Sequence, residues 1–194
     1  PYYKNMRNLW RLLKKNSFHI LFILSIILVS SIVFKELPKT FFQQDEWFGF
    51  GHAIYARTQG GGYYFRILSG SHFTPLNLFF FFLRFSLFGL HFVPYAYLSI
   101  FFHIINSLVV YFFVTRLTKE KVIGLLTGIL FATWYISYQA VTWIAAYPGT
   151  QGATFFLLLS LIFFLKYQDE KKKRKYYYLS GGYRGKSKSF YAIN

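Results

Sequence analysis

Long apolar runs alternate with short polar stretches along the chain, and this pattern determines the expected fold. Residues 17–34, 92–115 and 122–141 carry no formal charge, and a fourth apolar run extends over about 151–167. A membrane-spanning helix needs about 20 mostly apolar residues. The pattern therefore predicts an all-α, polytopic helical membrane protein with four transmembrane helices.

A fifth apolar run, residues 76–93, is interrupted by Arg84 and Gly89. If it does not cross the membrane, 17 of the Lys and Arg residues lie on one side and 5 on the other. The positive-inside rule favours this arrangement. It makes 76–93 an interfacial helix on the extracytoplasmic face, with Arg84 reaching the lipid headgroups. The alternative is a tilted fifth span with Arg84 facing the bundle interior.

The same charge distribution predicts the organisation and location of the chain. Residues 1–16 form a basic cytoplasmic segment, 17–167 the membrane domain with an outer loop at 35–91, and 168–194 a basic cytoplasmic tail or truncated continuation. Both ends of the chain are expected in the cytoplasm of a cell whose plasma (inner) membrane holds this multi-pass protein. The first residue is not Met and the last 15 residues lack a periodic pattern, so we expect a fragment.

Composition excludes several classes of protein. Hydrophobic residues make up 55% of the chain and charged residues only 14%, against about 25% charged residues in soluble domains. The absence of cysteine excludes disulfides and Cys nucleophiles. The net charge of +16 lies beside apolar runs, so anionic lipids, and not nucleic acid, are the expected partners.

The outer loop holds the acidic residues on which chemistry could depend. Asp45 is expected to cap a helix that runs to about Arg57 and ends before Gly60. Asp45 and Glu46 together could bind a divalent cation or act as a general base. The alternative is that Asp45 only caps the helix and Glu46 only faces water. No compact metal-ligand spacing of histidines and no other cofactor motif occurs in the chain.

Two patterns inside the apolar runs indicate helix contacts. Polar residues recur on one face of the second expected span: Ser99, His103, Asn106 and Ser107. They predict either interhelical hydrogen bonds or the wall of a substrate cavity. Gly124 and Gly128 are four residues apart in the third expected span, which permits close approach of a neighbouring helix.

The order of several short motifs carries a family resemblance over about residues 15–170. The motifs are Asp45-Glu46-Trp47, Phe73-Thr74-Pro75-Leu76, Phe88-Gly89-Leu90, His103-x-x-Asn106 and Ala140-Val141-Thr142-Trp143-Ile144. In this order they resemble the N-terminal part of the GT-C membrane glycosyltransferases. The nearest branch comprises proteins similar to protein O-mannosyltransferases and to mannosyltransferases linked to tetratricopeptide repeats.

The resemblance implies a function and a set of site residues. Such enzymes transfer a sugar from a polyprenyl-phosphate donor to a hydroxyl of a protein or glycan acceptor on the extracytoplasmic face. An acidic residue of the first outer loop is their usual base, which implies a catalytic role for Asp45 with Glu46 beside it. Arg57, Arg66 and His72 are the candidates for contacts with the donor phosphate, because of their charge and their side of the membrane.

Other readings of the same pattern remain open. The family has many more spans than this chain, and relatives often carry Arg where Thr74 stands. A non-catalytic integral membrane protein that binds lipid or a protein partner, or a truncated remnant of such an enzyme, has the same hydropathy pattern. A transporter is a weaker alternative, because transporters favour polar sites on broken spans, whereas three of the six acids here lie in the outer loop.

Overall fold

The structure, a computed structural model, describes residues 2–66 and 73–169, and the regular elements within them are helices. The elements in chain order are α1 (Tyr2–Val33), η1 (Leu37–Lys39), α2 (Gln44–Gln59), η2 (Gly61–Phe65), α3 (Pro75–Phe88), α4 (Phe92–Thr118), α5 (Lys121–Thr133), α6 (Tyr135–Thr142) and α7 (Tyr147–Asp169). The predicted all-α class is therefore confirmed for the described residues.

Three helical segments of the described chain are long and apolar enough to cross a membrane. They are Ser17–Lys39, Phe92–Thr118 and Tyr147–Asp169. The first, second and fourth expected spans match these segments. Because α1 begins at Tyr2, the basic segment 1–16 continues into the apolar segment as one helix.

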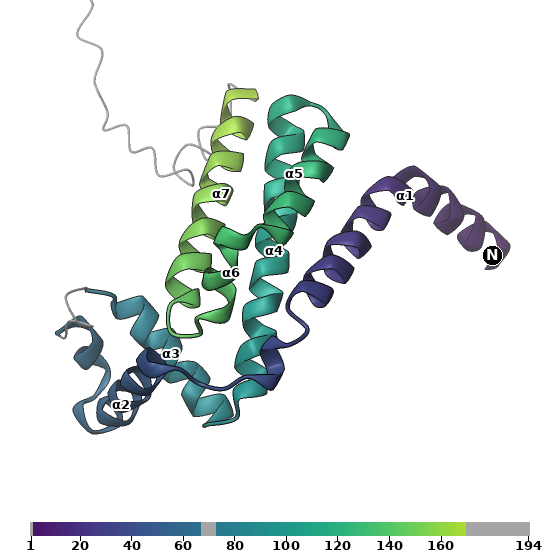
Figure 1. The fold of residues 1–194 in the computed structure, drawn as a ribbon. Coiled ribbons are helices and arrows are strands. Elements are labelled where there is room, and N and C mark those ends of the chain that lie inside the picture. The colour runs from purple at the N-terminus through teal and green to yellow at the C-terminus, as the bar shows by residue number, and fades with distance from the viewer. Residues whose placement is uncertain (1, 67–72, 170–194) are drawn as a thin grey trace, which may run out of the picture.

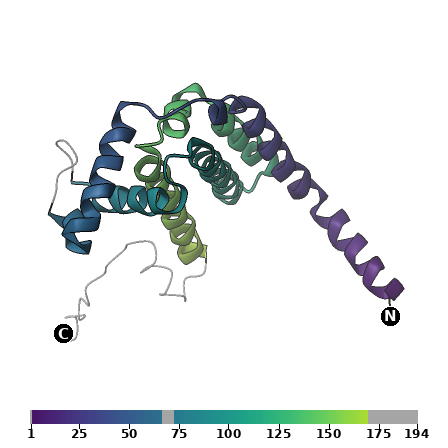
Figure 2. The ribbon, with the colours of Figure 1, turned by 90° about the horizontal axis from the view of Figure 1, so that it is seen from below.

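The long helices form an upright group, and α2 and α3 form a transverse unit at one end of it (Figure 1). Helices α4, α5 and α7 lie side by side, while α1 diverges from them toward its N-terminus. Helices α2 and α3 pack on each other where α4 begins, and Figure 2 shows them from below. At the opposite end Arg116 of α4 bonds Asp169 of α7 at 2.7 Å. Helices α4 and α7 therefore point in the same direction.

The third expected span, residues 122–141, is not one helix. It is divided into α5 and α6 at Trp134, whose backbone is extended with ψ of 128°. Helix α5 has only 13 residues and α6 only 8. Apolar residues continue across the break, so hydropathy alone does not reveal it. A break at this depth is tolerated where other protein groups satisfy the freed backbone atoms.

The two glycines of α5 lie against neighbouring helices, as predicted. A Cβ at Gly124 would stand 3.0 Å from the Tyr111 backbone oxygen of α4. A Cβ at Gly128 would stand 3.0 Å from the Phe22 ring of α1 and 3.2 Å from Cβ of Tyr111. These distances are tighter than ordinary van der Waals contact, so the absence of side chains allows α1, α4 and α5 to pack closely.

The expected interfacial helix at 76–93 is shorter than predicted. Helix α3 has Pro75 in its first turn, as expected, and ends at Phe88. Gly89 then adopts a φ of +55°, a conformation that favours glycine. The chain turns there, and residues 92 and 93 belong to α4. The fourteen residues of α3 are too few for a span.

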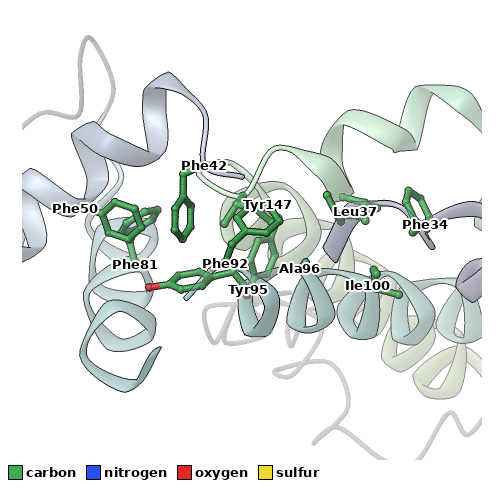
Figure 3. Packing of buried hydrophobic residues seen from close by; sticks show 12 residues of the cluster. Phe34, Leu37, Phe42, Phe50, Phe81, Phe92, Tyr95, Ala96, Ile100 and Tyr147 are labelled. Carbon is green, nitrogen blue, oxygen red and sulfur yellow. The ribbon is translucent and has the colours of Figure 1, made fainter. Parts of the chain in front are cut away.

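The main apolar core joins the transverse unit to the long helices (Figure 3). Phe42 and Phe50 from the α2 region and Phe81 from α3 pack toward Phe92 and Tyr95 at the start of α4. Ring centroids of Phe42 and Phe50 lie 4.7 Å apart, edge to face. Such aromatic pairs stabilise by about 0.5–1.5 kcal/mol beyond area burial. This core fixes the outer helices on the bundle end.

Candidate functional site

The start of α2 positions the two candidate acids. Gln43, and not Asp45, is the N-cap, and it forms a capping box with Glu46. The helix thus begins before the predicted position, because the reciprocal Gln43–Glu46 bonds satisfy the first free backbone donors. Asp45 is exposed in the first turn, where its charge favours the positive end of the helix dipole. The helix ends at Gly60, as expected, with φ of +74°.

Glu46 is buried, with 1% of its surface exposed, so the expectation that it faces water is wrong. One carboxylate oxygen accepts the Gln43 backbone N–H of the capping box. The other accepts the Ala145 backbone N–H at 2.9 Å, across 99 positions of the sequence. These two hydrogen bonds offset the cost of burying the polar carboxyl group. Glu46 thus holds α2 against the segment before α7.

Arg84 is also buried, at 4% exposure, so the expectation that it reaches the lipid headgroups is wrong. Its Nη1 donates to the Ile144 carbonyl at 3.3 Å and its Nε to the Phe80 carbonyl at 3.2 Å. The guanidinium lies 4.5 Å from the centre of the Tyr147 ring, a cation–π contact. Burial lowers the pKa of Arg84, and Tyr147 opposes that effect. The guanidinium stays charged, because its reference pKa is above 12.

These contacts form what we call the outer clamp: Glu46, Asn77 and Arg84 holding the backbone of Ile144 and Ala145. Asn77 of α3 completes it by donating to the Ala145 carbonyl at 3.2 Å. Three polar side chains from two helices therefore satisfy two consecutive residues between α6 and α7. The sequence gives no signal for this pairing, because the partners are 60 to 99 positions apart.

The geometry does not favour a cation shared by Asp45 and Glu46. Consecutive residues of a helix point about 100° apart, and here one side chain is exposed while the other is buried. Both Glu46 oxygens already accept N–H groups. Within residues 2–66 and 73–169, no cluster of three His, Asp or Glu side chains could hold a metal ion. We therefore derive no step through a metal.

Of the candidate donor contacts, Arg57 lies far from Asp45. Arg57 is 12 residues further along α2, about 18 Å at the rise of a helix, and it lies over the Phe85 ring at 5.5 Å. Arg66 is exposed after η2, with Nε donating to the Gly62 carbonyl at 3.3 Å. His72 lies outside the described residues. A donor phosphate beside Asp45 would thus not contact Arg57 in this arrangement.

A second polar group, the mid-span polar set, consists of Ser99, His103, Asn106 and Gln151. Ser99 Oγ donates to the Val141 carbonyl at 2.6 Å, and Gln151 Nε2 donates to the Ala140 carbonyl at 2.8 Å. His103 Nε2 donates to the Ala132 carbonyl at 3.2 Å, so this nitrogen carries a proton. Asn106 Nδ2 donates to the Gln151 carbonyl at 3.0 Å.

The predicted interhelical hydrogen bonds of α4 are confirmed for Ser99, His103 and Asn106, whereas Ser107 donates to the His103 carbonyl of its own helix. The acceptors in α5 and α6 are carbonyls of their last turns, Ala132 in α5 and Ala140 and Val141 in α6. The set thus supplies donors to carbonyls at helix ends that have no partner within their own helix. Gln151 was not among the predicted contact residues, because it stands at the first position of its apolar run beside polar and glycine residues.

Comparison of the chain with models of protein families, with curated proteins and with solved structures gives no match.

Proposed function

We propose that this chain is part of a membrane glycosyltransferase that uses a polyprenyl-phosphate sugar donor, with Asp45 as the general base. The observation that carries the proposal is the contrast between two adjacent acids. Asp45 is exposed in the first turn of α2, while its neighbour Glu46 is buried and anchors that turn to the α7 segment. An exposed carboxyl group on an anchored helix turn is accessible to an acceptor hydroxyl, which a general base requires. Glycosyl transfer is proposed as the reaction because the order of the sequence motifs resembles that of the GT-C glycosyltransferases.

The proposed reaction needs few protein groups. The Asp45 carboxylate accepts the proton of an acceptor hydroxyl, whose oxygen attacks the anomeric carbon of the donor sugar. The bond from that carbon to the phosphate oxygen breaks, and polyprenyl phosphate leaves with both bonding electrons. A single displacement inverts the anomeric carbon. Glu46 acts as a positioning residue. We assign the contacts with the donor phosphate to Arg66 and His72 in preference to Arg57.

The proposal includes a topology for the described helices. Helices α5 and α6 together have the length to cross about 30 Å of hydrocarbon, in spite of the break at Trp134. With that crossing the chain spans the membrane four times, and the transverse unit of α2 and α3 lies on the extracytoplasmic face. The positive-inside rule then puts both ends of this chain in the cytoplasm, and the membrane is the plasma membrane.

The test compares Asp45→Asn with Glu36→Gln in the native full-length polypeptide, in membranes of the source cell. Glu36 is the matched control, because it is an exposed outer-loop acid paired only with Lys39 at the surface. Transfer from a panel of radiolabelled polyprenyl-phosphate sugars is measured at equal protein level. Loss of a general base reduces the rate about 10²–10⁴-fold, so Asp45→Asn should lose that factor and Glu36→Gln should not. Equal rates in both variants would remove Asp45 from this role.

A second candidate function is a non-catalytic membrane protein that binds lipid or a protein partner. The observation that favours it is the exposed surface of α7, which carries four large apolar side chains: Phe156, Leu157, Leu161 and Phe164. Such a face suits lipid or another membrane helix. Absence of transfer from every donor in the panel by the wild-type polypeptide would favour this function over the enzyme.

A further inference from the structure

A cavity of about 290 Å³ lies inside the bundle, beside the break between α5 and α6. Its lining comes from four helices or their junctions: His103, Asn106, Phe131, Trp134, Ala140, Gln151 and Thr154. His103 and Asn106 are near the middle of the 27 residues of α4. The cavity therefore lies beside the middle of α4 and the first turns of α7, in the part of the bundle that the proposed topology places in the membrane.

Two polar atoms of the lining residues are left without a partner among the described residues. They are Asn106 Oδ1 and Gln151 Oε1, both buried. The orientation of each amide is fixed, because its nitrogen donates to a backbone carbonyl that only accepts. Both orphaned atoms are thus acceptors. A buried acceptor without a donor costs about 1–3 kcal/mol, so a bound donor would stabilise the site.

The remaining surface of the cavity selects against charge. No Asp, Glu, Lys or Arg is among the lining residues, and an ion at this depth would lose its hydration without a counter-charge. Acceptor oxygens also repel a phosphate group. Phe131 and Trp134 provide apolar area for a hydrocarbon. The volume is at the lower end of the range for ligand pockets, about 300–1,000 Å³, which suits a small amphiphile or one end of a longer chain.

The cavity reaches the lipid-facing surface. Trp134 is 47% exposed and Thr154 is partly exposed, so two of the lining residues also belong to the exterior. Large apolar side chains of the same two helices are also exposed, Leu130 on α5 and Phe156 and Leu157 on α7. A ligand would therefore enter from the hydrocarbon phase.

We propose that this cavity is a binding site for a neutral, hydroxyl-bearing lipid or alkanol, whose hydroxyl donates to Asn106 Oδ1 or Gln151 Oε1 while its hydrocarbon lies against Phe131 and Trp134. The site is distinct from the proposed catalytic Asp45 and does not depend on glycosyl transfer. It excludes the phosphate of a polyprenyl-phosphate donor.

The test uses photoactivatable 3-azioctanol on the native full-length polypeptide in membranes, with labelled positions mapped by peptide mass spectrometry. Label should concentrate on residues 131–134 and 151–154. 1-Octanol should compete at least ten-fold better than octyl phosphate or octane. Two results would overturn the proposal: label spread over the exposed face of α7, or equal competition by 1-octanol, octyl phosphate and octane. The cavity would then be a site for water and not for an alcohol.

A pair of variants separates the cavity from the nearby surface. Thr154→Phe fills the cavity and should reduce labelling of 131–134 at least five-fold, while Ala153→Phe adds the same ring to the adjacent exposed position of α7 and should leave it unchanged. The competition series needs no variant, so the proposal stays testable if Thr154→Phe fails to fold. Asp45→Asn should label like wild type, which distinguishes failure of this site from failure of the proposed enzyme.

Discussion

The outer clamp and the mid-span polar set solve the same problem with different chemistry. Each satisfies backbone groups where a helix ends: the clamp at Ile144 and Ala145 before α7, the polar set in the last turns of α5 and α6. The clamp uses a carboxyl and a guanidinium group, whereas the polar set uses only hydroxyl, imidazole and amide groups. In the proposed topology the polar set lies deeper in the membrane, and the difference fits the higher cost of charge inside the hydrocarbon than near its edge.

The largest expected effect comes from placing a charge in the mid-span polar set. Gln151→Glu should destabilise the fold by about 3 kcal/mol or more at pH 8, because an ionised carboxylate there has no buried counter-charge. Burial raises the pKa of such a carboxyl, so the folded form favours the protonated state and stability should recover toward pH 5. Unfolding in detergent at both pH values measures this.

An exposed glutamine outside the apolar helices supplies the control for that variant. Gln59→Glu makes the same change at the exposed last residue of α2 and should shift stability by less than about 0.5 kcal/mol. Equal losses in the two variants would show that depth does not separate the two regions.

Removal of a charge from the outer clamp should have the next largest effect. Arg84→Ala leaves the Ile144 carbonyl without its donor and removes the cation–π contact with Tyr147. We expect a loss of about 3 kcal/mol, measured by thermal unfolding in detergent. Arg66→Ala, at an exposed arginine, is the control. A stability loss in Arg84→Ala no greater than in this control would contradict the structural role of the clamp.

The smallest expected effect is a pH dependence outside both regions. The Tyr63 hydroxyl donates to neutral His52 Nδ1, and burial lowers the pKa of His52. The fold therefore favours the neutral ring: its contribution is present above about pH 6.5 and is lost as the pH falls through the lowered value. Amide exchange over residues 52–65, corrected for intrinsic rates, should be faster at pH 5 than at pH 7.5. His52→Gln should remove this dependence, and its persistence there would assign it to another group.

Elements that depend on local chemistry were predictable, and those that depend on distant contacts were not. Residue types at three positions predict local features correctly: α2 ends before Gly60, α3 begins at Pro75, and Gly124 contacts a neighbouring helix closely. The break at Trp134 escaped prediction, because the Ala132 carbonyl before it is bonded by His103 of α4, 29 positions away. The burial of Arg84 escaped for the same reason, since its Ile144 acceptor is 60 positions away.

The candidate site shows the same division. The exposure of Asp45 follows from its place in the first turn of a surface helix, whereas the burial of Glu46 depends on Ala145. Positive charge in the outer loop identified Arg57 as a candidate contact for the donor phosphate, but the helical rise separates it from Asp45. Charge and side of the membrane therefore identify candidate groups without bringing them to one place.

The outer clamp also couples α7 to the α2–α3 unit. The three side chains of the clamp bind the backbone just before α7, so a rotation of the α2–α3 unit would tilt α7 about that point. The 23 residues of α7 extend about 35 Å, and a 10° tilt would move the far end by about 6 Å. That end is tied to α4 by Asp169, which pairs with Arg116 at 2.7 Å and with Lys119 at 3.9 Å, weak surface contacts. A ligand that shifted the α2–α3 unit would thereby act at the opposite end of the bundle, as the opening of these two ion pairs.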